Sequence, residues 1–165
     1  MNKRTLSAAV ISAFCANAIA EETYTTGTID VYSVAPLPGI GIEKSILPSA
    51  IQEVSMEQVK DQAGVSIADY LVNNAAGVTV TEVGGNPWQP EIKFRGYTAG
   101  SIAGNEQGIS VYVDGVRENQ PFSDVVLWDT LPSFAYESAQ VVPGSNPIYG
   151  LNTLGGAVSF QTKSG

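Results

Sequence analysis

The chain has 165 residues, of which 16 are acidic and 8 are basic; it contains no histidine and one cysteine, and its formal net charge at pH 7 is −8. An acidic chain repels nucleic acids and anionic lipid surfaces, so a nucleic-acid-binding function is disfavoured. Without histidine and with a single cysteine, zinc, haem and iron–sulfur sites and Ser/His/Asp or Cys/His catalysis are not expected. We therefore predict no metal, no cofactor and no enzymatic activity.

Residues 1–20 have the layout of a secretory signal peptide. Two basic residues come first, an apolar run over 6–14 succeeds them, and the small-residue site Ala18-Ile19-Ala20 predicts cleavage after Ala20. The apolar run is shorter than the roughly 20 residues that span a bilayer. Cleavage would remove Cys15 and change the formal charge from −8 to −10, because Lys3 and Arg4 leave with it. The remaining chain suffices for one domain but not for a transmembrane barrel of about eight or more strands.

Residues 21–45 predict an extended, flexible segment. They are rich in Thr, Gly and Pro, show no helical period and end near Pro36-Leu37-Pro38-Gly39. Within them Ile29–Val34 is β-prone, yet prolines interrupt the chain directly after it and no core partner is evident. Such a segment can donate a strand to another protein.

Two short helices are expected next. After an apolar, strand-like run over Ile51–Val54, Ser55 and Gln58 form a capping-box pattern for a helix through Gln62. A second pattern, Ser66 with Asp69, predicts a helix that stops at Gly77.

The character of the chain changes after Gly77, where two-residue alternation of apolar residues predicts strands. The turn signal Asp114-Gly115 ends one of them. The expected strands lie around Val78 and Val80, around Ile92 and Phe94, and over Ile109–Val113, Gln140–Val142 and Ala157–Gln161. The order of elements predicts a small α+β domain with a mixed β-sheet, short helices and long loops, preceded by the extended N-terminal segment.

Two loops are long for a compact domain, Tyr97–Gly108 and Glu118–Pro132. Long loops of this kind are commonly functional or disordered. The second carries Phe122 and Trp128, which favours an ordered loop. These aromatic side chains either line a binding surface or close the core of the domain itself.

Several segments resemble, in the right order, the plug domain of TonB-dependent outer-membrane receptors. The closing signature is carried by Tyr149-Gly150, by Asn152 and by Leu154-Gly155-Gly156 through Thr162-Lys163. Before it come a helix with Ala76-Gly77-Val78, the run Phe94-Arg95-Gly96-Tyr97 and the strand and turn Val111–Val116. The resemblance implies a plug domain over residues 46–165.

The resemblance also implies partners and a location. It places the chain in the outer membrane, where a plug fills a β-barrel domain of the same protein and its N-terminal segment faces the periplasm. TonB would pull a strand-forming segment, the TonB box, to open a path for a small-molecule nutrient such as an iron chelate. The position of the TonB box corresponds to Ile29, Asp30, Val31, Tyr32, Ser33 and Val34.

The resemblance further implies two sets of site residues. The residues expected on ligand-side loops are Trp88, Gln89, Tyr97, Glu106, Gln107, Phe122, Asp124 and Trp128. The residues expected to anchor the structure are Arg95, Gly96, Asp114, Gly115, Tyr149, Gly150, Gly155 and Gly156, with Arg95 paired to a carboxylate.

Two other classes of function remain open. A free periplasmic binding module, or a truncated remnant of a receptor, would use the same fold without a barrel. A secreted hydrolase would need two carboxylates such as Asp124 and Asp129 in one cleft. Nothing in their loop favours the hydrolase.

Overall fold

The computed structural model describes residues 31–33, 41–43, 51–56 and 66–164. The expected signal peptide lies outside the described residues, and so do most of the expected first helix and the positions Ile29, Asp30 and Val34. The described part contains strands, one α-helix and short 3-10 turns, which confirms the α+β class.

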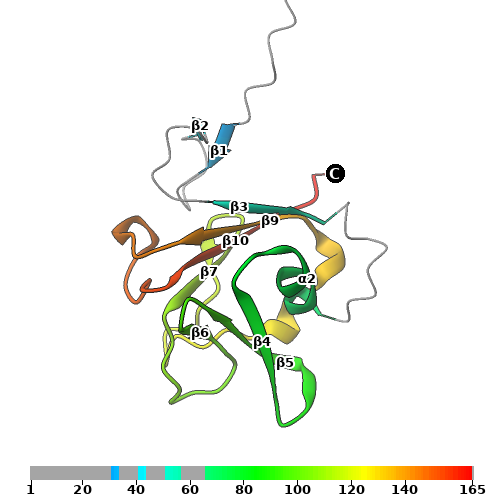
Figure 1. Ribbon diagram of the computed structural model, residues 1–165, viewed down its shortest axis with the longest axis vertical. Coiled ribbons are helices and arrows are strands. Elements are labelled where there is room, and N and C mark those ends of the chain that lie inside the picture. The colour runs from blue at the N-terminus through cyan, green and yellow to red at the C-terminus, as the bar shows by residue number, and fades with distance from the viewer. Residues whose placement is uncertain (1–30, 34–40, 44–50, 57–65, 165) are drawn as a thin grey trace, which may run out of the picture.

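A five-stranded mixed sheet forms the larger layer (Figure 1). Its spatial order is β3-β9-β10-β7-β8. The strands are β3 (Gln52–Ser55), β7 (Ile109–Val113), β8 (Val116–Arg117), β9 (Tyr136–Pro143) and β10 (Gly156–Thr162). Strand β10 runs parallel to β7 and antiparallel to β9, which makes it the centre of the sheet. These strands confirm the expected apolar runs, although β9 begins four residues earlier than predicted.

A three-stranded antiparallel sheet holds β4 (Val78–Val83), β5 (Asn86–Phe94) and β6 (Tyr97–Ala99) in sequence order. Gly84 and Gly85 separate β4 from β5 with φ of 63° and 72°. Positive φ at both central positions is typical of tight hairpin turns, because it matches the twist of the two strands. The sequence therefore specifies this hairpin through its glycine pair.

Helix α2 (Ile67–Asn74) confirms the second expected helix. Its first turn is closed by Asp69, whose carboxylate accepts hydrogen bonds from the Ser66 backbone N–H at 2.9 Å and from the Ser66 hydroxyl at 3.2 Å. After the helix, the Gln52 side chain of β3 donates to the Ala76 carbonyl at 3.1 Å and accepts from the Ala76 N–H at 2.6 Å. Within the described residues, no helix has the length and apolar character needed to cross a membrane.

The main core lies between the two sheets and α2. Leu71 of α2, Ile92 of β5 and Phe160 of β10 are each at most 1% exposed. Alternation along β7 sends Ile109 and Val111 into this core, while Tyr112 joins a smaller cluster that also holds Tyr149. Both faces of the large sheet are therefore covered near β7 and β10.

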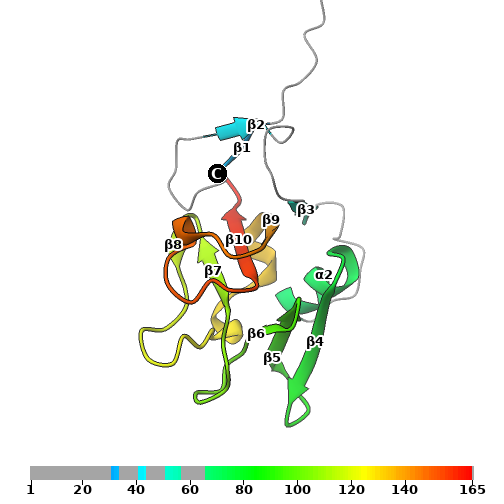
Figure 2. The same ribbon diagram turned by 60° about the vertical axis from the view of Figure 1, so that its left-hand side comes forward.

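Strand β1 (Val31–Ser33) pairs antiparallel with β2 (Gly41–Glu43) in a separate two-stranded sheet. The sequence predicts a β-prone segment here without an evident core partner; the structure gives Val31–Ser33 a strand partner, β2, in a sheet separate from the other two. In both views the β4–β5 turn and the loop from β6 to β7 lie at the end of the molecule opposite β1 and β2 (Figures 1 and 2).

Candidate functional site

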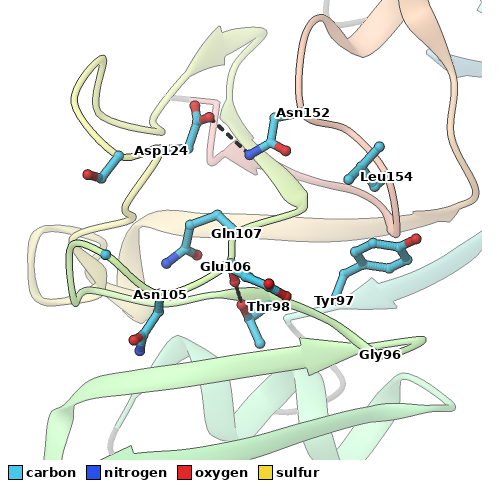
Figure 3. Close-up of a pocket in the computed structure, with 11 residues that line it drawn as sticks. Gly96, Tyr97, Thr98, Asn105, Glu106, Gln107, Asp124, Asn152 and Leu154 are labelled. Atoms are coloured by element: carbon cyan, nitrogen blue, oxygen red, sulfur yellow. Dashed lines mark hydrogen bonds between the residues drawn. The ribbon is translucent and has the colours of Figure 1, made fainter.

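A cavity of about 550 Å³, lined by both polar and apolar groups, opens between three loops of the domain. One loop joins β6 to β7 (residues 100–108), one comes after β8 (118–127), and one joins β9 to β10 (144–155). We call this cavity the Tyr97 groove. Its lining consists of Gly96, Tyr97, Thr98, Gly104, Asn105, Glu106, Gln107, Ser123, Asp124, Asn152 and Leu154 (Figure 3).

Tyr97 is held against two glycines that have no room for a side chain. A Cβ added to Gly108 would lie 2.6 Å from Cδ1 of the Tyr97 ring, and one added to Gly155 would lie 2.7 Å from its Cδ2. The backbone fixes the same residues, because the Gly108 carbonyl accepts from the N–H groups of Leu154 and Gly155 at 3.0 and 2.9 Å. With 39% of its surface exposed, Tyr97 is a rigid aromatic platform in the wall of the groove.

The loop over residues 100–108 is shaped by Gln107. This side chain is only 8% exposed; its Oε1 accepts from the Gly100 N–H at 2.9 Å and its Nε2 donates to the Ile102 carbonyl at 3.5 Å. The Thr98 hydroxyl donates to the Glu106 carbonyl and closes the loop on β6. Gln107 therefore supports the loop from inside, while Asn105 and Glu106 are exposed.

The opposite wall is joined by an ion pair and an amide. Asp124 accepts from Arg117 Nη2 at 3.2 Å through one oxygen and from Asn152 Nδ2 at 3.0 Å through the other. Arg117 Nη2 also donates to the Leu151 carbonyl at 2.9 Å. The loop over 118–127 is thereby tied to the loop over 144–155, on the side of the groove that faces Thr98 and Glu106 (Figure 3).

Asn119 anchors the same wall to the sheet. Its Oδ1 accepts from the Val111 N–H at 2.7 Å, and its Nδ2 donates to the carbonyls of Ile109 and Asp124, both at 3.1 Å. The side chain is buried and meets its hydrogen-bonding capacity within the protein. Sequence reasoning missed Arg117 and Asn119, and it gave Asn152 a place in the closing signature but no contact, because the partners of these side chains lie in other segments of the chain.

The predicted ligand-side residues separate into two groups. Tyr97, Glu106, Gln107 and Asp124 line the Tyr97 groove. The other four, Trp88, Gln89, Phe122 and Trp128, are outside its lining.

Trp128 takes the core role, one of the two that the sequence leaves open for it. Its ring is 3% exposed, belongs to the main core and donates from Nε1 to the Ala99 carbonyl at 3.1 Å. It also contributes to the lining of the cavity that holds Trp88. Trp88 is 55% exposed and lies with Asp129 at a second cavity of about 260 Å³. Asp124 and Asp129 line different cavities, so the cleft that the hydrolase would need is not formed by this pair.

The predicted anchors fall mostly at turns and close contacts. Asp114 accepts from the Thr162 N–H at 2.9 Å and from its hydroxyl at 2.7 Å, which joins the β7–β8 turn to the end of β10. Gly115, Gly96 and Gly150 have positive φ. A Cβ on Gly156 would lie 2.3 Å from the Val142 carbonyl oxygen.

Arg95 departs from its expected role. The residue is exposed at the β5–β6 turn, with φ of 53°. Among the residues that the structure describes, no carboxylate pairs with it.

Tyr149 and Tyr112 join the loop over 144–155 to the sheet. The Tyr112 hydroxyl donates to the Tyr149 carbonyl, and the two rings are tilted by 57° with centroids 5.9 Å apart. Burial raises the pKa of both phenols; the Arg117 charge acts in the opposite direction on Tyr112, and Tyr112 adds to the increase at Tyr149.

Comparison with protein families gives one match over most of the chain. A model of the TonB-dependent receptor plug domain matches residues 43–157. No curated protein sequence matches.

Solved structures share the fold. The ferric yersiniabactin uptake receptor FyuA from Yersinia pestis matches 70% of this chain with 23% identity and a TM-score of 0.52. The RagAB peptide importer matches 82% with 24% identity and a TM-score of 0.60, and the alcaligin outer-membrane receptor FauA from Bordetella pertussis matches 85% with 20% identity and a TM-score of 0.53. The matched parts are 17%, 14% and 23% of those chains, so this chain spans a small part of their length.

Proposed function

Because the chain belongs to the family of TonB-dependent receptor plug domains, we propose that it is the plug of an outer-membrane receptor and gates energy-coupled uptake of a scarce nutrient such as an iron chelate. The observation that carries this proposal is the family match over residues 43–157. The mixed sheet and its long loops support it, since plugs in solved receptors share this fold. In this role the protein is exported, resides in the outer membrane within a β-barrel and performs no catalysis.

The two ends of the molecule suit two tasks. The loop over 100–108 lies opposite β1 and β2 in both views (Figures 1 and 2). We assign the nutrient to the side of this loop, with Tyr97, Glu106 and Asp124 as the groove residues nearest to it. Trp88, Gln89 and Phe122 remain ligand-side assignments on neighbouring exposed surface.

The other end offers a strand to TonB. Strand β1 covers Val31–Ser33 of the assigned TonB box and has one described neighbour, β2. A strand in a two-stranded sheet has a second edge whose backbone groups can pair with an added strand. TonB therefore either adds to that edge of β1 or replaces β2.

Substitution of Val31 tests this coupling. Val31→Pro removes a backbone N–H and a ladder hydrogen bond, so the affinity of the chain for the periplasmic domain of TonB should fall by at least about tenfold, measured by titration calorimetry. Val31→Thr is the matched control, because it keeps the N–H and the β-branched side chain. If both variants bind TonB with equal affinity, the assignment of the TonB box is wrong. No binding of TonB by the unaltered chain would contradict the proposed coupling to TonB.

A further inference from the structure

Residues with positive φ gather at the Tyr97 groove. In the described part of the chain, five non-glycine residues have positive φ, and three of them line this cavity: Ser123, Asp124 and Asn152, at 62°, 51° and 61°. Asp and Asn adopt this conformation more readily than other residues with a Cβ. Hydrogen bonds from Arg117 and Asn152 to Asp124 hold two of these three residues in place. This wall of the groove is therefore built by specific polar contacts.

The size and shape of the groove suit a small ligand. Its volume of about 550 Å³ lies within the range of small-molecule sites. The Tyr97 platform and the half-exposed Leu154 lie side by side at one end of it (Figure 3). An apolar surface fixed beside polar groups fits a molecule with a flat C–H face and a polar rim.

The polar groups of the lining favour a ligand that donates hydrogen bonds. The side chains of Asn105 and Glu106 are exposed and have no hydrogen-bond partner among the described residues. A carboxylate only accepts hydrogen bonds, and an amide oxygen accepts while its nitrogen donates. Hydroxyl and amine groups satisfy this set, and a hydrogen bond to the Glu106 carboxylate is charge-assisted.

The charges of the groove disfavour an anion. Among its described lining residues there is no lysine or arginine. Arg117, which lies behind the wall, is engaged by Asp124 and by the Leu151 carbonyl. A ligand carboxylate or phosphate would thus meet the negative charge of Glu106 without a free cation to offset it. Repulsion between these like charges lowers the affinity for an anionic ligand.

We propose that the Tyr97 groove binds a saccharide-type ligand that presents hydroxyl or amine groups, and that it rejects ligands that present carboxylates. The Tyr97 ring and Leu154 contact the C–H face of a sugar ring, and Glu106 and Asn105 bind its hydroxyl or amine groups. The physiological role of this site rests on the proposed function, and it narrows the nutrient to one that presents a sugar ring with hydroxyl or amine groups to the plug. Binding itself is a property of the chain and can be measured without transport.

The test uses three sets of immobilised oligosaccharides: neutral, amine-bearing and uronate-bearing. The chain should be retained by members of the neutral or amine-bearing sets and not by uronate-bearing ones. Glu106→Gln should weaken the retained interaction by about tenfold, because a charge-assisted hydrogen bond is replaced by a neutral one. Glu137→Gln is the matched control, since Glu137 is an exposed carboxylate on β9 outside the groove, and it should leave binding unchanged.

Three results would overturn the proposal. They are retention by uronate-bearing glycans equal to that by neutral ones, no retention by any neutral or amine-bearing glycan, and equal affinities of the Glu106→Gln and Glu137→Gln variants. Stronger retention by amine-bearing glycans than by neutral ones identifies an amino sugar as the ligand. None of these outcomes changes the TonB-binding result, so failure of this proposal and failure of the proposed function are separable.

Discussion

The centre of the large sheet and the walls of the Tyr97 groove are stabilised in different ways. Strands β7, β9 and β10 bury Val111, Val141, Val158 and Phe160 at 2% exposure or less. The groove walls instead meet through polar contacts such as Asp124 with Asn152. Apolar burial is cumulative and tolerates small errors of position, whereas each hydrogen bond depends on the placement of two particular atoms. We therefore expect the groove to open at a lower free-energy cost than the sheet unfolds.

Phe160→Ala should have the largest effect on the sheet. The ring is fully buried between the two sheets and contacts Tyr136 with centroids 5.1 Å apart. Removal of a buried phenylalanine ring leaves a cavity and costs about 3–5 kcal/mol of unfolding free energy. Denaturant unfolding of the purified chain measures this loss. Phe134→Ala is the control, because that ring is 78% exposed and its loss should change stability by roughly 0.5 kcal/mol or less. Equal losses in the two variants would contradict the assigned core.

Asn119→Ala should destabilise the wall of the groove more than the large sheet. Three backbone groups lose their partner, namely the Val111 N–H and the carbonyls of Ile109 and Asp124. We expect a loss of about 2 kcal/mol, since buried polar groups left without a partner each carry a desolvation penalty that water entering the loop partly relieves. Hydrogen exchange should speed up at the Val111 N–H, which loses its acceptor, and across residues 118–127, while the other amides of the large sheet stay protected. Asn105→Ala is the control, as that amide is exposed. Uniform faster exchange over the whole chain would show that the wall and the sheet open together.

The same contrast explains which elements the sequence predicts. Alternation at Ile109–Val113 and the Ser66–Asp69 cap signal their elements locally, and both are observed. The Gly84-Gly85 pair also signals the hairpin of β4 and β5, although the alternation pattern alone does not join these two strands. The β-prone character of β1 is evident from its residues, whereas its pairing with β2 is not, because prolines stand between the two strands in the sequence and no local pattern joins them.

The site was harder to predict than the fold. Tyr97, Glu106 and Asp124 line the groove, and their assignment as ligand contacts stays a prediction. Tyr97 lies in β6, so the expected loop over Tyr97–Gly108 begins later in the structure. The sequence leaves two roles open for Trp128, because an aromatic residue in a loop has the same local signal whether it enters the core or faces a ligand. Asn152 belongs to the closing signature, but its contact could not be predicted because it depends on Asp124, which is 28 residues away in the chain. Partners so distant in sequence are fixed only by the packed sheet between them.

Tyr112→Phe probes the junction between the two regions and should have the smallest effect at neutral pH. It removes the hydrogen bond to the Tyr149 carbonyl from a buried ring, at a cost of about 1 kcal/mol. The folded-state pKa of Tyr112 is raised by burial above its ordinary value of 10.0. The folded chain therefore binds this proton more tightly than the unfolded chain does, and the resulting stability is complete below pH 10 and lost as the pH rises through the folded-state pKa. The variant lacks this group, so the difference in unfolding free energy between the two proteins should shrink above pH 10. Tyr149→Phe should show the same trend, because burial also raises the pKa of Tyr149. For both variants, the difference in unfolding free energy from the unaltered chain could instead stay constant with pH. That result would mean that the contact between Tyr112 and Tyr149 opens without unfolding of the sheet, as we expect of the groove walls.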